Sequence, residues 1–229
     1  MPALMKEKTD LIDYICKKEG ARSFADLGGV WRVHGGYTFY ALKNRQIERA
    51  YLVDTNFTPR VMLRRLLHPR LKLVHSNFGD AAVPRTLGAV DTVFLFDVLL
   101  HQVSPNWDEI LRMYANATRS FIIYNQQYLG PKTVRLLDLG EEEYFRNVPH
   151  PREQEPYASL FQRLDQLHPE HKRPYRDIHN IWQWGIRDED LVRVMGDLGF
   201  QQVYYRNHGM WGNLKNFEGH SFVFVKRQK

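Results

Sequence analysis

Two short apolar runs of this sequence end in residues that suit a nucleoside ligand. The run 23–27 contains Asp26 and stops at the pair Gly28-Gly29, and the run 49–53 stops at Asp54. Glycines let a backbone approach a ligand closely, and an acidic side chain at the end of a second strand accepts hydrogen bonds from ribose hydroxyls. The spacing therefore predicts a nucleoside site where two neighbouring strands end.

Polar side chains also stand at the ends of two later apolar runs. His101 follows the run 92–96, and an imidazole titrating near neutrality suits a general base for a hydroxyl acceptor. The alternative is a histidine that hydrogen-bonds backbone at a strand end. Tyr124, Asn125 and Gln126 stand where the run 120–124 stops. They suit a polar small molecule, and the alternative is a set of solvent-facing turn residues.

The elements that must position these residues alternate along the chain. Apolar runs stopped by Gly or Asp predict strands at 23–27, 49–53, 71–75, 92–96, 120–124, 202–205 and 221–226. Helical spacing predicts helices at 9–18, 37–47, 59–67, 107–117 and 188–198, the first capped by Thr9 or Asp10. This alternation predicts an α/β fold with a doubly wound, mostly parallel sheet and helices on both faces. Ligands bind such a sheet beyond the carboxyl ends of its strands.

The pattern breaks after the fifth strand, where 131–174 holds six of the eleven prolines. We interpret this stretch as an insertion or acceptor lid. His179 and Trp184 near its end are candidates for an acceptor pocket, and the alternative is an ordinary amphipathic cover. The last two strands have no helix between them, so we expect them to pair antiparallel. The chain is then a single domain with an N-terminal helix (1–20), a cofactor-binding half (21–130), the insertion (131–180) and a closing part (181–229).

Composition excludes several classes of protein. The 229 residues are 43% apolar and 25% charged, which is typical of a globular chain. No apolar stretch approaches the roughly 20 residues of a membrane span, and the first residues lack the apolar core of a signal peptide. The single cysteine, Cys16, excludes an internal disulfide and fits a cytoplasmic protein. We expect Cys16 to be buried in the core, and we expect no metal site.

The net charge of +6 permits an anionic partner without requiring nucleic acid. The local basic cluster lies at 60–72, where Leu63, Leu66 and Leu67 interleave with arginines as core positions would. No series of aromatic residues for base stacking accompanies it. We therefore expect a solvated helix face rather than a nucleic-acid surface.

Four segments resemble the class I S-adenosylmethionine-dependent methyltransferases. FADLGG (24–29) is similar to the first motif of that family, YLVD (51–54) to its second strand, HSNFGD (75–80) to its adenine-contacting turn, and VDTVFLFDVLLHQV (90–103) to its fourth strand and following loop. The helix ending in DLGF and the two final strands resemble the close of that fold, a seven-stranded sheet whose last strand inserts antiparallel. The chain departs from the family's Gly-x-Gly-x-Gly pattern at GGVWRVHGG (28–36).

The resemblance implies S-adenosylmethionine as cofactor, with S-adenosylhomocysteine as product. It places the glycine turn along the methionine part, the second-strand acid on the ribose, and the residues after the fourth strand at the amino-acid end. The adenine turn can be aligned in two ways, so three of its residues remain candidates. The implied cofactor residues are Asp26, Gly28, Gly29, Val30, Asp54, Thr55, Asn77, Phe78, Asp80, Asp97, Val98 and Leu99.

The function expected is methyl transfer to an oxygen or nitrogen of a small polar metabolite. Displacement on an activated sulfonium needs chiefly a well-positioned acceptor. One alternative is an RNA acceptor, which a salt-dependent affinity for tRNA would reveal. A second is a nicotinamide-dependent oxidoreductase, which the missing third glycine and Asp26 disfavour. A third is a non-catalytic binding module that keeps the sheet, since fold alone does not establish activity.

Overall fold

Seven strands form one sheet in the computed structural model, which describes residues 3–227. Its strand order is β3-β2-β1-β4-β5-β9-β8. The strands are β1 (Ser23–Leu27), β2 (Arg49–Asp54), β3 (Leu71–His75), β4 (Val90–Phe96), β5 (Thr118–Tyr128), β8 (Phe200–Met210) and β9 (Phe217–Lys226). Neighbours from β3 to β5 pair parallel, whereas β9 pairs antiparallel with β5 and with β8. The predicted seven-stranded, mostly parallel sheet with an antiparallel last strand is confirmed.

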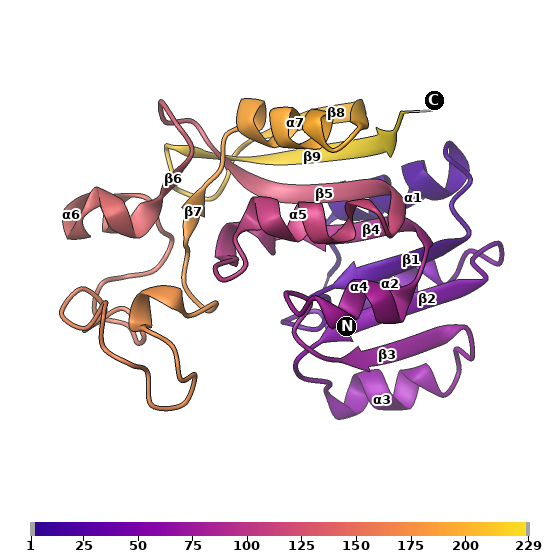
Figure 1. The fold of residues 1–229 in the computed structure, drawn as a ribbon, viewed down its shortest axis with the longest axis horizontal. Coiled ribbons are helices and arrows are strands. Elements are labelled where there is room, and N and C mark those ends of the chain that lie inside the picture. Colours follow the sequence, from indigo (N-terminus) through magenta and orange to yellow (C-terminus); the bar gives the residue numbers. More distant parts are fainter. Residues whose placement is uncertain (1–2, 228–229) are drawn as a thin grey trace.

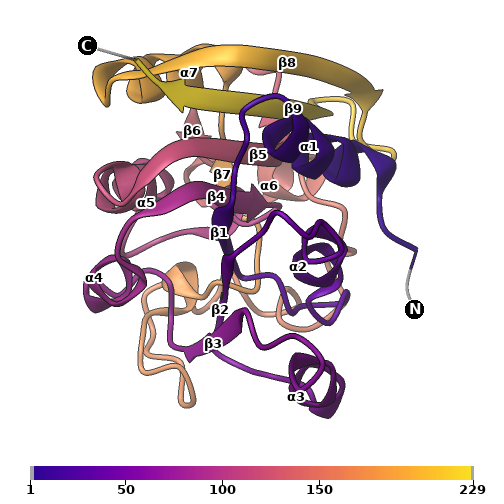
Figure 2. The ribbon, with the colours of Figure 1, turned by 90° about the vertical axis from the view of Figure 1, so that its right-hand side faces the viewer.

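Helices cover both faces of this sheet (Figure 2). One face carries α1 (Lys6–Lys17), α2 (Gly36–Ala41) and α3 (Pro59–Arg65), and the other carries α4 (Ala82–Leu87), α5 (Trp107–Ala115) and α7 (Asp188–Asp197). Each face has its own apolar core. One is built on Phe24, Phe94 and Ile122, and the other on Val93, Phe121 and Phe222.

Helix α5 shows how sequence fixes an element here. Asn106 and Glu109 form a capping box at its start, in which the Glu109 carboxylate accepts from the Asn106 N–H at 2.6 Å. Trp107, Ile110 and Tyr114 then recur at helical spacing and are buried against the sheet.

The insertion lies beyond the carboxyl ends of the parallel strands (Figure 1). It contains β6 (Val134–Arg135) and α6 (Glu141–Arg146), with 3₁₀ turns η2 (Leu136–Leu139) and η3 (Tyr175–Asp177), and β7 (Trp184–Gly185) follows it. Strands β6 and β7 form a separate two-stranded sheet. An aromatic core that includes Tyr144, Tyr157 and Trp182 packs against Leu100 and Phe217 of the main fold.

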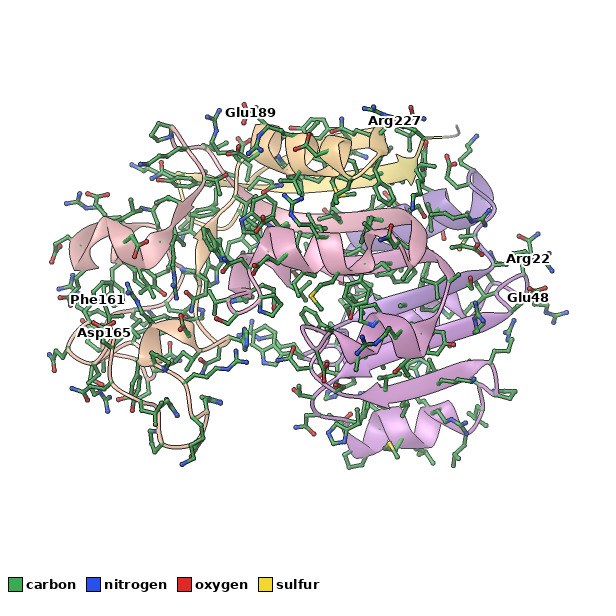
Figure 3. The ribbon with its side chains drawn as sticks, viewed as in Figure 1. Arg22, Glu48, Phe161, Asp165, Glu189 and Arg227 are labelled. Atoms are coloured by element: carbon green, nitrogen blue, oxygen red, sulfur yellow. The ribbon has the colours of Figure 1, made fainter. Side chains whose placement is uncertain are left out.

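The opposite, amino-terminal end of the parallel strands carries exposed charged residues. Arg22 and Glu48 point toward one another there as an ion pair. Phe161 and Asp165 of the insertion lie on the far side of the molecule (Figure 3). The insertion therefore lies at the carboxyl-end edge, where ligands bind in such sheets.

Several predicted boundaries were wrong. Helix α2 ends at Ala41 rather than at 47, and α3 ends at Arg65 rather than at 67. Strand β8 is longer than the predicted 202–205, and β9 begins at Phe217 rather than at 221, because the two strands pair with each other along most of their length.

Helix α1 begins at Lys6 behind Met5, and the Thr9 hydroxyl donates to the Lys6 carbonyl inside the helix instead of capping its start. Strand β5 continues to Tyr128 rather than stopping at 124, because residues 217–221 of β9 pair with residues 124–128. Tyr124, Asn125 and Gln126 therefore lie inside a buried strand and are not turn residues.

The expected core role of the α3 leucines was also wrong. Leu63, Leu66 and Leu67 are 68, 69 and 79% exposed, and Val61 is the buried residue of the helix. The reason is position, since α3 is a short helix beside β3, the edge strand of the sheet. Helix α4 was not predicted, whereas β1 and β3 have the predicted bounds and Cys16 is buried as expected.

Candidate functional site

A cavity of about 110 Å³ opens where the strand order reverses between β1 and β4. In an open parallel sheet this is the usual place for a ligand. Its lining comes from the ends of β1, β2 and β3, from the turn after η1 (Leu99–His101), and from the insertion. The lining residues are Gly28, Asp54, Thr55, Asn77, Phe78, Gln102 and His179. Five of them belong to the expected cofactor residues and His179 to the expected acceptor residues, while Gln102 was missed.

Asp54 presents a carboxylate with spare acceptor capacity to this cavity. Its Oδ2 accepts from the Val30 N–H at 3.0 Å and its Oδ1 from the Asn56 N–H at 3.2 Å. Each carboxylate oxygen has about two lone pairs, so the carboxylate keeps acceptor capacity for a ligand. Burial raises the pKa of Asp54, and the hydrogen bond from the Val30 N–H opposes that rise.

Gly28 allows an aromatic ring to approach the end of β1. It has φ +74°, and a Cβ placed on it would lie 3.0 Å from Val98 Cγ1 and 3.3 Å from Phe78 Cε1. Phe78 is fixed by the Tyr114 hydroxyl, which donates to its carbonyl at 2.7 Å. Asn77 Oδ1 accepts from the Gly79 N–H at 2.8 Å and shapes the same turn. A flat ring and a carboxylate thus face one cavity.

Asp26 lies beneath the glycine loop rather than in the cavity lining. It is 1% exposed, and its Oδ2 accepts from the Thr38 hydroxyl at 2.5 Å. A Cβ on Gly29 would lie 2.4 Å from that same Oδ2, so only glycine fits above the carboxylate. Burial raises the pKa of Asp26 to about 7, against the opposing hydrogen bond from Thr38.

Asp97 ends β4 in a left-handed conformation with φ +56°. Its Oδ1 accepts from Gln126 Nε2 at 2.8 Å, and its Oδ2 accepts from the buried Lys8 ammonium. Lys8 was not predicted from the sequence. A cation at helical spacing with Leu11, Ile12 and Ile15 is the signal that could have found it.

The two histidines near the cavity are held as neutral rings. His101 Nδ1 lies 2.7 Å from the Ile181 carbonyl and must carry the proton, since a carbonyl only accepts. His179 Nδ1 lies 3.3 Å from the His101 carbonyl, and its Nε2 accepts from Arg173 at 2.8 Å. Burial lowers the pKa of both His101 and His179. His101 does not line the cavity, but Gln102 beside it does.

The remaining candidate residues have structural surroundings. The exposed Asp80 accepts from the Ala82 N–H at 2.8 Å and does not line the cavity. Leu99 is buried in the core, and Trp184 Nε1 donates to the Gln102 carbonyl at 2.7 Å. In β5 two buried amide atoms, Asn125 Oδ1 and Gln127 Nε2, have no hydrogen-bond partner among the described residues.

Residues 3–227 contain neither a cluster of metal ligands nor a helix that could span a membrane. No three side chains of His, Cys, Asp or Glu gather there as metal ligands would. No helix of this part of the chain has the length and apolar character needed to cross a membrane.

No family model matches the sequence, and no curated protein matches it. Solved structures do resemble the fold. The N-terminal domain of EvdMO1, solved with S-adenosylhomocysteine and D-fucose, has a TM-score of 0.61 at 13% identity, over 98% of this chain and 85% of that one. Magnesium protoporphyrin IX methyltransferase from Synechocystis, solved with S-adenosylhomocysteine, has a TM-score of 0.58 at 13% identity, over 96% and 82% of the two chains.

A third solved structure adds a different acceptor. The 1,6-didemethyltoxoflavin-N1-methyltransferase of Burkholderia thailandensis, solved with its acceptor and S-adenosylhomocysteine, has a TM-score of 0.57 at 12% identity, over 97% of this chain and 79% of that one. All three structures superimpose on nearly the whole of this chain at 12–13% identity. The chain therefore has the fold of the class I S-adenosylmethionine-dependent methyltransferases.

Proposed function

We propose that this protein is an S-adenosylmethionine-dependent methyltransferase that acts on an oxygen or nitrogen atom of a small polar metabolite. The observation that carries the proposal is the cavity at the β1/β4 reversal, where Asp54 faces Phe78 with spare acceptor capacity. Solved proteins of this fold hold S-adenosylhomocysteine.

The side chains that line the cavity fit the adenosine part of this cofactor. The remaining acceptor capacity of Asp54 suits the ribose hydroxyls, and the ring of Phe78 offers an apolar face to the adenine. Gly28 keeps the first turn of the loop free of a side chain. The cavity of about 110 Å³ is smaller than the roughly 300 Å³ or more that encloses a whole ligand. In this proposal the amino-acid end of the cofactor therefore lies outside it, past Val98 and toward Asp97.

The cofactor supplies a methyl group on a positively charged sulfur, and the chain's own residues position the acceptor. His101 is the base in this proposal. Its Nδ1 proton is committed to the Ile181 carbonyl, which leaves Nε2 unprotonated and able to take a proton from a hydroxyl acceptor. Arg173 and the His101 carbonyl fix His179 at the rim of the cavity.

The insertion favours a small acceptor. It lies over the carboxyl ends of the strands and supplies His179 to the cavity lining. In this proposal the insertion covers the site during the reaction, which would exclude water from the reacting atoms and leave little room for a folded RNA. The acceptor lid expected at 131–180 is retained in this proposal.

The test of the proposal is binding followed by turnover. Isothermal titration with S-adenosylmethionine and S-adenosylhomocysteine should give saturable binding, and a saturating ligand at about 100 times its dissociation constant adds about 2.7 kcal/mol of stability. Reduced nicotinamide dinucleotide should neither bind nor shift the thermal midpoint. Binding of the nicotinamide compound without the adenosyl compounds would replace the methyltransferase proposal with an oxidoreductase.

His101→Gln tests the proposed base. The variant should bind S-adenosylhomocysteine as the wild type does and should turn over a hydroxyl acceptor about 100-fold more slowly, because general-base catalysis contributes about 10²–10⁴-fold. Equal losses of binding and turnover would assign His101 to the structure of the site instead. A wild type that binds cofactor and methylates nothing in a metabolite screen would favour a binding module.

RNA is a second candidate acceptor because of the exposed basic helix α3. Arg60 and Arg65 are exposed there beside exposed leucines. Phosphate contacts would make tRNA affinity fall steeply with added salt. Titration of tRNA at 50 and 200 mM salt decides the question, and a flat or absent response removes this acceptor.

A further inference from the structure

Helix α3 presents apolar side chains to solvent at one corner of the molecule, beside the edge strand β3 (Figure 2). Met62 is 53% exposed, and Leu63, Leu66 and Leu67 are more exposed still. The Leu66 and Leu67 N–H groups donate to carbonyls three residues earlier, so the turn continues past Arg65. Residues at this spacing share one side of a helix, and we call these four apolar residues the α3 face. Contiguous exposed apolar groups of this kind mark interaction sites.

Basic side chains flank the α3 face. Residues 55–79 contain no Asp or Glu. The basic side chains of this stretch are Arg60, Arg64, Arg65, Arg70 and Lys72. By helical spacing Arg60 and Arg65 lie on opposite sides of the α3 face, and both are exposed. Burial and the charges of Arg64 and Arg70 lower the pKa of His68 in the turn after the helix, which fits a surface rich in cations.

Several occupants could cover such a face, and charge separates them. A second copy of the chain would bring one set of arginines against another, and like charges across an interface are unfavourable. RNA would pair with the arginines but would leave the leucines against a polar surface, and residues 59–67 include no aromatic side chain for base stacking. A bilayer with anionic lipid offers phosphates to the arginines and acyl chains to the leucines at the same time. An acidic protein would need a groove shaped to these projecting side chains, whereas a bilayer deforms around them.

We propose that α3 docks the protein on an anionic lipid bilayer, with the α3 face at the boundary of the acyl chains and with Arg60 and Arg65 on lipid phosphates. The helix has seven residues and a bilayer span takes about 20, so α3 lies in the plane of the interface. This inference goes beyond methyl transfer and does not depend on it. Thr55 of the cavity lining comes shortly before the helix in the chain, so docking also places the cavity near the lipid head groups.

The attachment should be reversible and sensitive to salt. A single apolar signal gives only marginal membrane binding, and stable attachment takes a second signal such as a basic patch. The α3 face supplies the first signal and the flanking arginines supply the second. Because salt screens charges at a surface, binding should fall between about 50 and about 200 mM salt.

Flotation of the full chain with lipid vesicles tests the proposal. One set of vesicles contains phosphatidylcholine alone, and the other contains phosphatidylcholine with about one-third phosphatidylglycerol, an anionic lipid. The wild type should float with the anionic vesicles at the lower salt concentration and should stay behind when the vesicles are neutral. Two groups of substitutions then separate the apolar from the basic contribution.

The first variant combines Leu63→Gln, Leu66→Gln and Leu67→Gln, and the second combines Arg60→Gln and Arg65→Gln. The leucine variant should bind anionic vesicles at least about 10-fold more weakly, because burial of a leucine side chain is worth about that factor or more. The arginine variant should bind them about 30-fold more weakly, at about 5-fold for each basic side chain near an anionic surface. Gln has about the helix propensity of Leu and Arg, so the thermal midpoints should stay close to that of the wild type.

Matched controls change the same residue types elsewhere. Leu129→Gln, Leu167→Gln and Met210→Gln together remove three exposed apolar side chains outside α3. Arg112→Gln and Arg193→Gln together remove the same charge from exposed positions of α5 and α7. Both control variants should float with anionic vesicles as the wild type does.

Several outcomes would overturn the inference. Absence of wild-type binding to either set of vesicles, equal binding to both, or the same loss in the control variants would each reject an anionic-lipid surface at α3. Binding of tRNA that the arginine variant loses and the leucine variant keeps, without vesicle binding, would assign the helix to RNA. A wild-type dimer in sedimentation velocity that the leucine variant loses would assign the face to a second copy. Cofactor binding is measured separately, so its failure would reject the proposed function and leave this inference standing.

Discussion

Asp26 and Asp54 lie near the ends of the neighbouring strands β1 and β2 and have opposite surroundings. Asp26 belongs to a loop floor, Asp26, Gly29 and Thr38, in which the carboxylate is sealed beneath the backbone. Asp54 belongs to a pocket wall, Asp54, Thr55, Asn77 and Phe78, in which the carboxylate reaches a cavity. Burial raises the pKa of both, to about 7 for Asp26. The comparison shows that an acid at a strand end becomes structural or ligand-binding according to what covers it.

Gly29→Ala should break the loop floor and have the largest effect. Its Cβ would lie 2.4 Å from Asp26 Oδ2, a distance that real structures do not tolerate, so the loop or the carboxylate must move. Overpacking of this kind costs about 3 kcal/mol at its upper range. Urea denaturation should show that loss, and S-adenosylhomocysteine affinity should fall with it because the loop also carries Gly28 and the Val30 N–H.

Gly196→Ala is the matched control. No atom lies within 4 Å of the Cβ it would add, in the last turn of α7, so it should stabilise the protein by at most about 1 kcal/mol. Adding Asp26→Ala to Gly29→Ala removes the clashing carboxylate, and the pair should cost less than the sum of the single changes. Strict additivity would mean that the floor is not closed by this contact.

The stability of the protein should depend on pH because Asp26 is buried. An unfolded Asp26 titrates near 3.8 and the folded one near 7, so between these values the folded state binds more protons and stability falls as pH rises. Each unit of the window corresponds to about 1.4 kcal/mol, which gives about 2 to 3 kcal/mol between pH 5 and pH 7. Asp26→Asn cannot titrate, so the difference between wild type and variant isolates the effect. Parallel urea midpoints for the two proteins at both pH values would contradict a buried, protonated Asp26.

The sequence predicted strands and site residues correctly where the pattern within a single segment is enough to determine its structure. Strands β1 and β3 have the predicted bounds, because apolar runs bounded by Gly, Ser or charged residues are recognisable alone. The pocket-wall residues Asp54, Thr55, Asn77 and Phe78 were also among the predicted cofactor residues. Their identification depended on strand ends and on family resemblance, both of which are local in sequence.

Non-local contacts account for what was not predicted. Strand β5 is extended by its pairing with β9, which begins 89 residues after Tyr128. The α3 leucines are exposed because no strand lies beyond β3. Lys8 can be buried because Asp97, 89 residues further along the chain, neutralises its charge. No sequence window contains both partners of such contacts, so residue type alone could not assign them.

Asp54→Ala gives the smallest of the three effects and tests the pocket wall directly. Two ribose hydroxyls would lose a charged acceptor, so S-adenosylhomocysteine should bind about 30-fold more weakly, or about 2 kcal/mol. Stability should change little, because water can reach the Val30 and Asn56 N–H groups that the carboxylate now holds. Asp80→Ala is the control, since that exposed carboxylate binds the Ala82 N–H outside the cavity and its loss should leave affinity unchanged. If calorimetry finds that Asp54→Ala binds S-adenosylhomocysteine as tightly as the wild type and that Asp80→Ala binds it more weakly, the ribose is bound by Asp80 and not by Asp54. The ligand-binding acid would then lie in the turn after β3, and Asp54 would be a structural residue like Asp26.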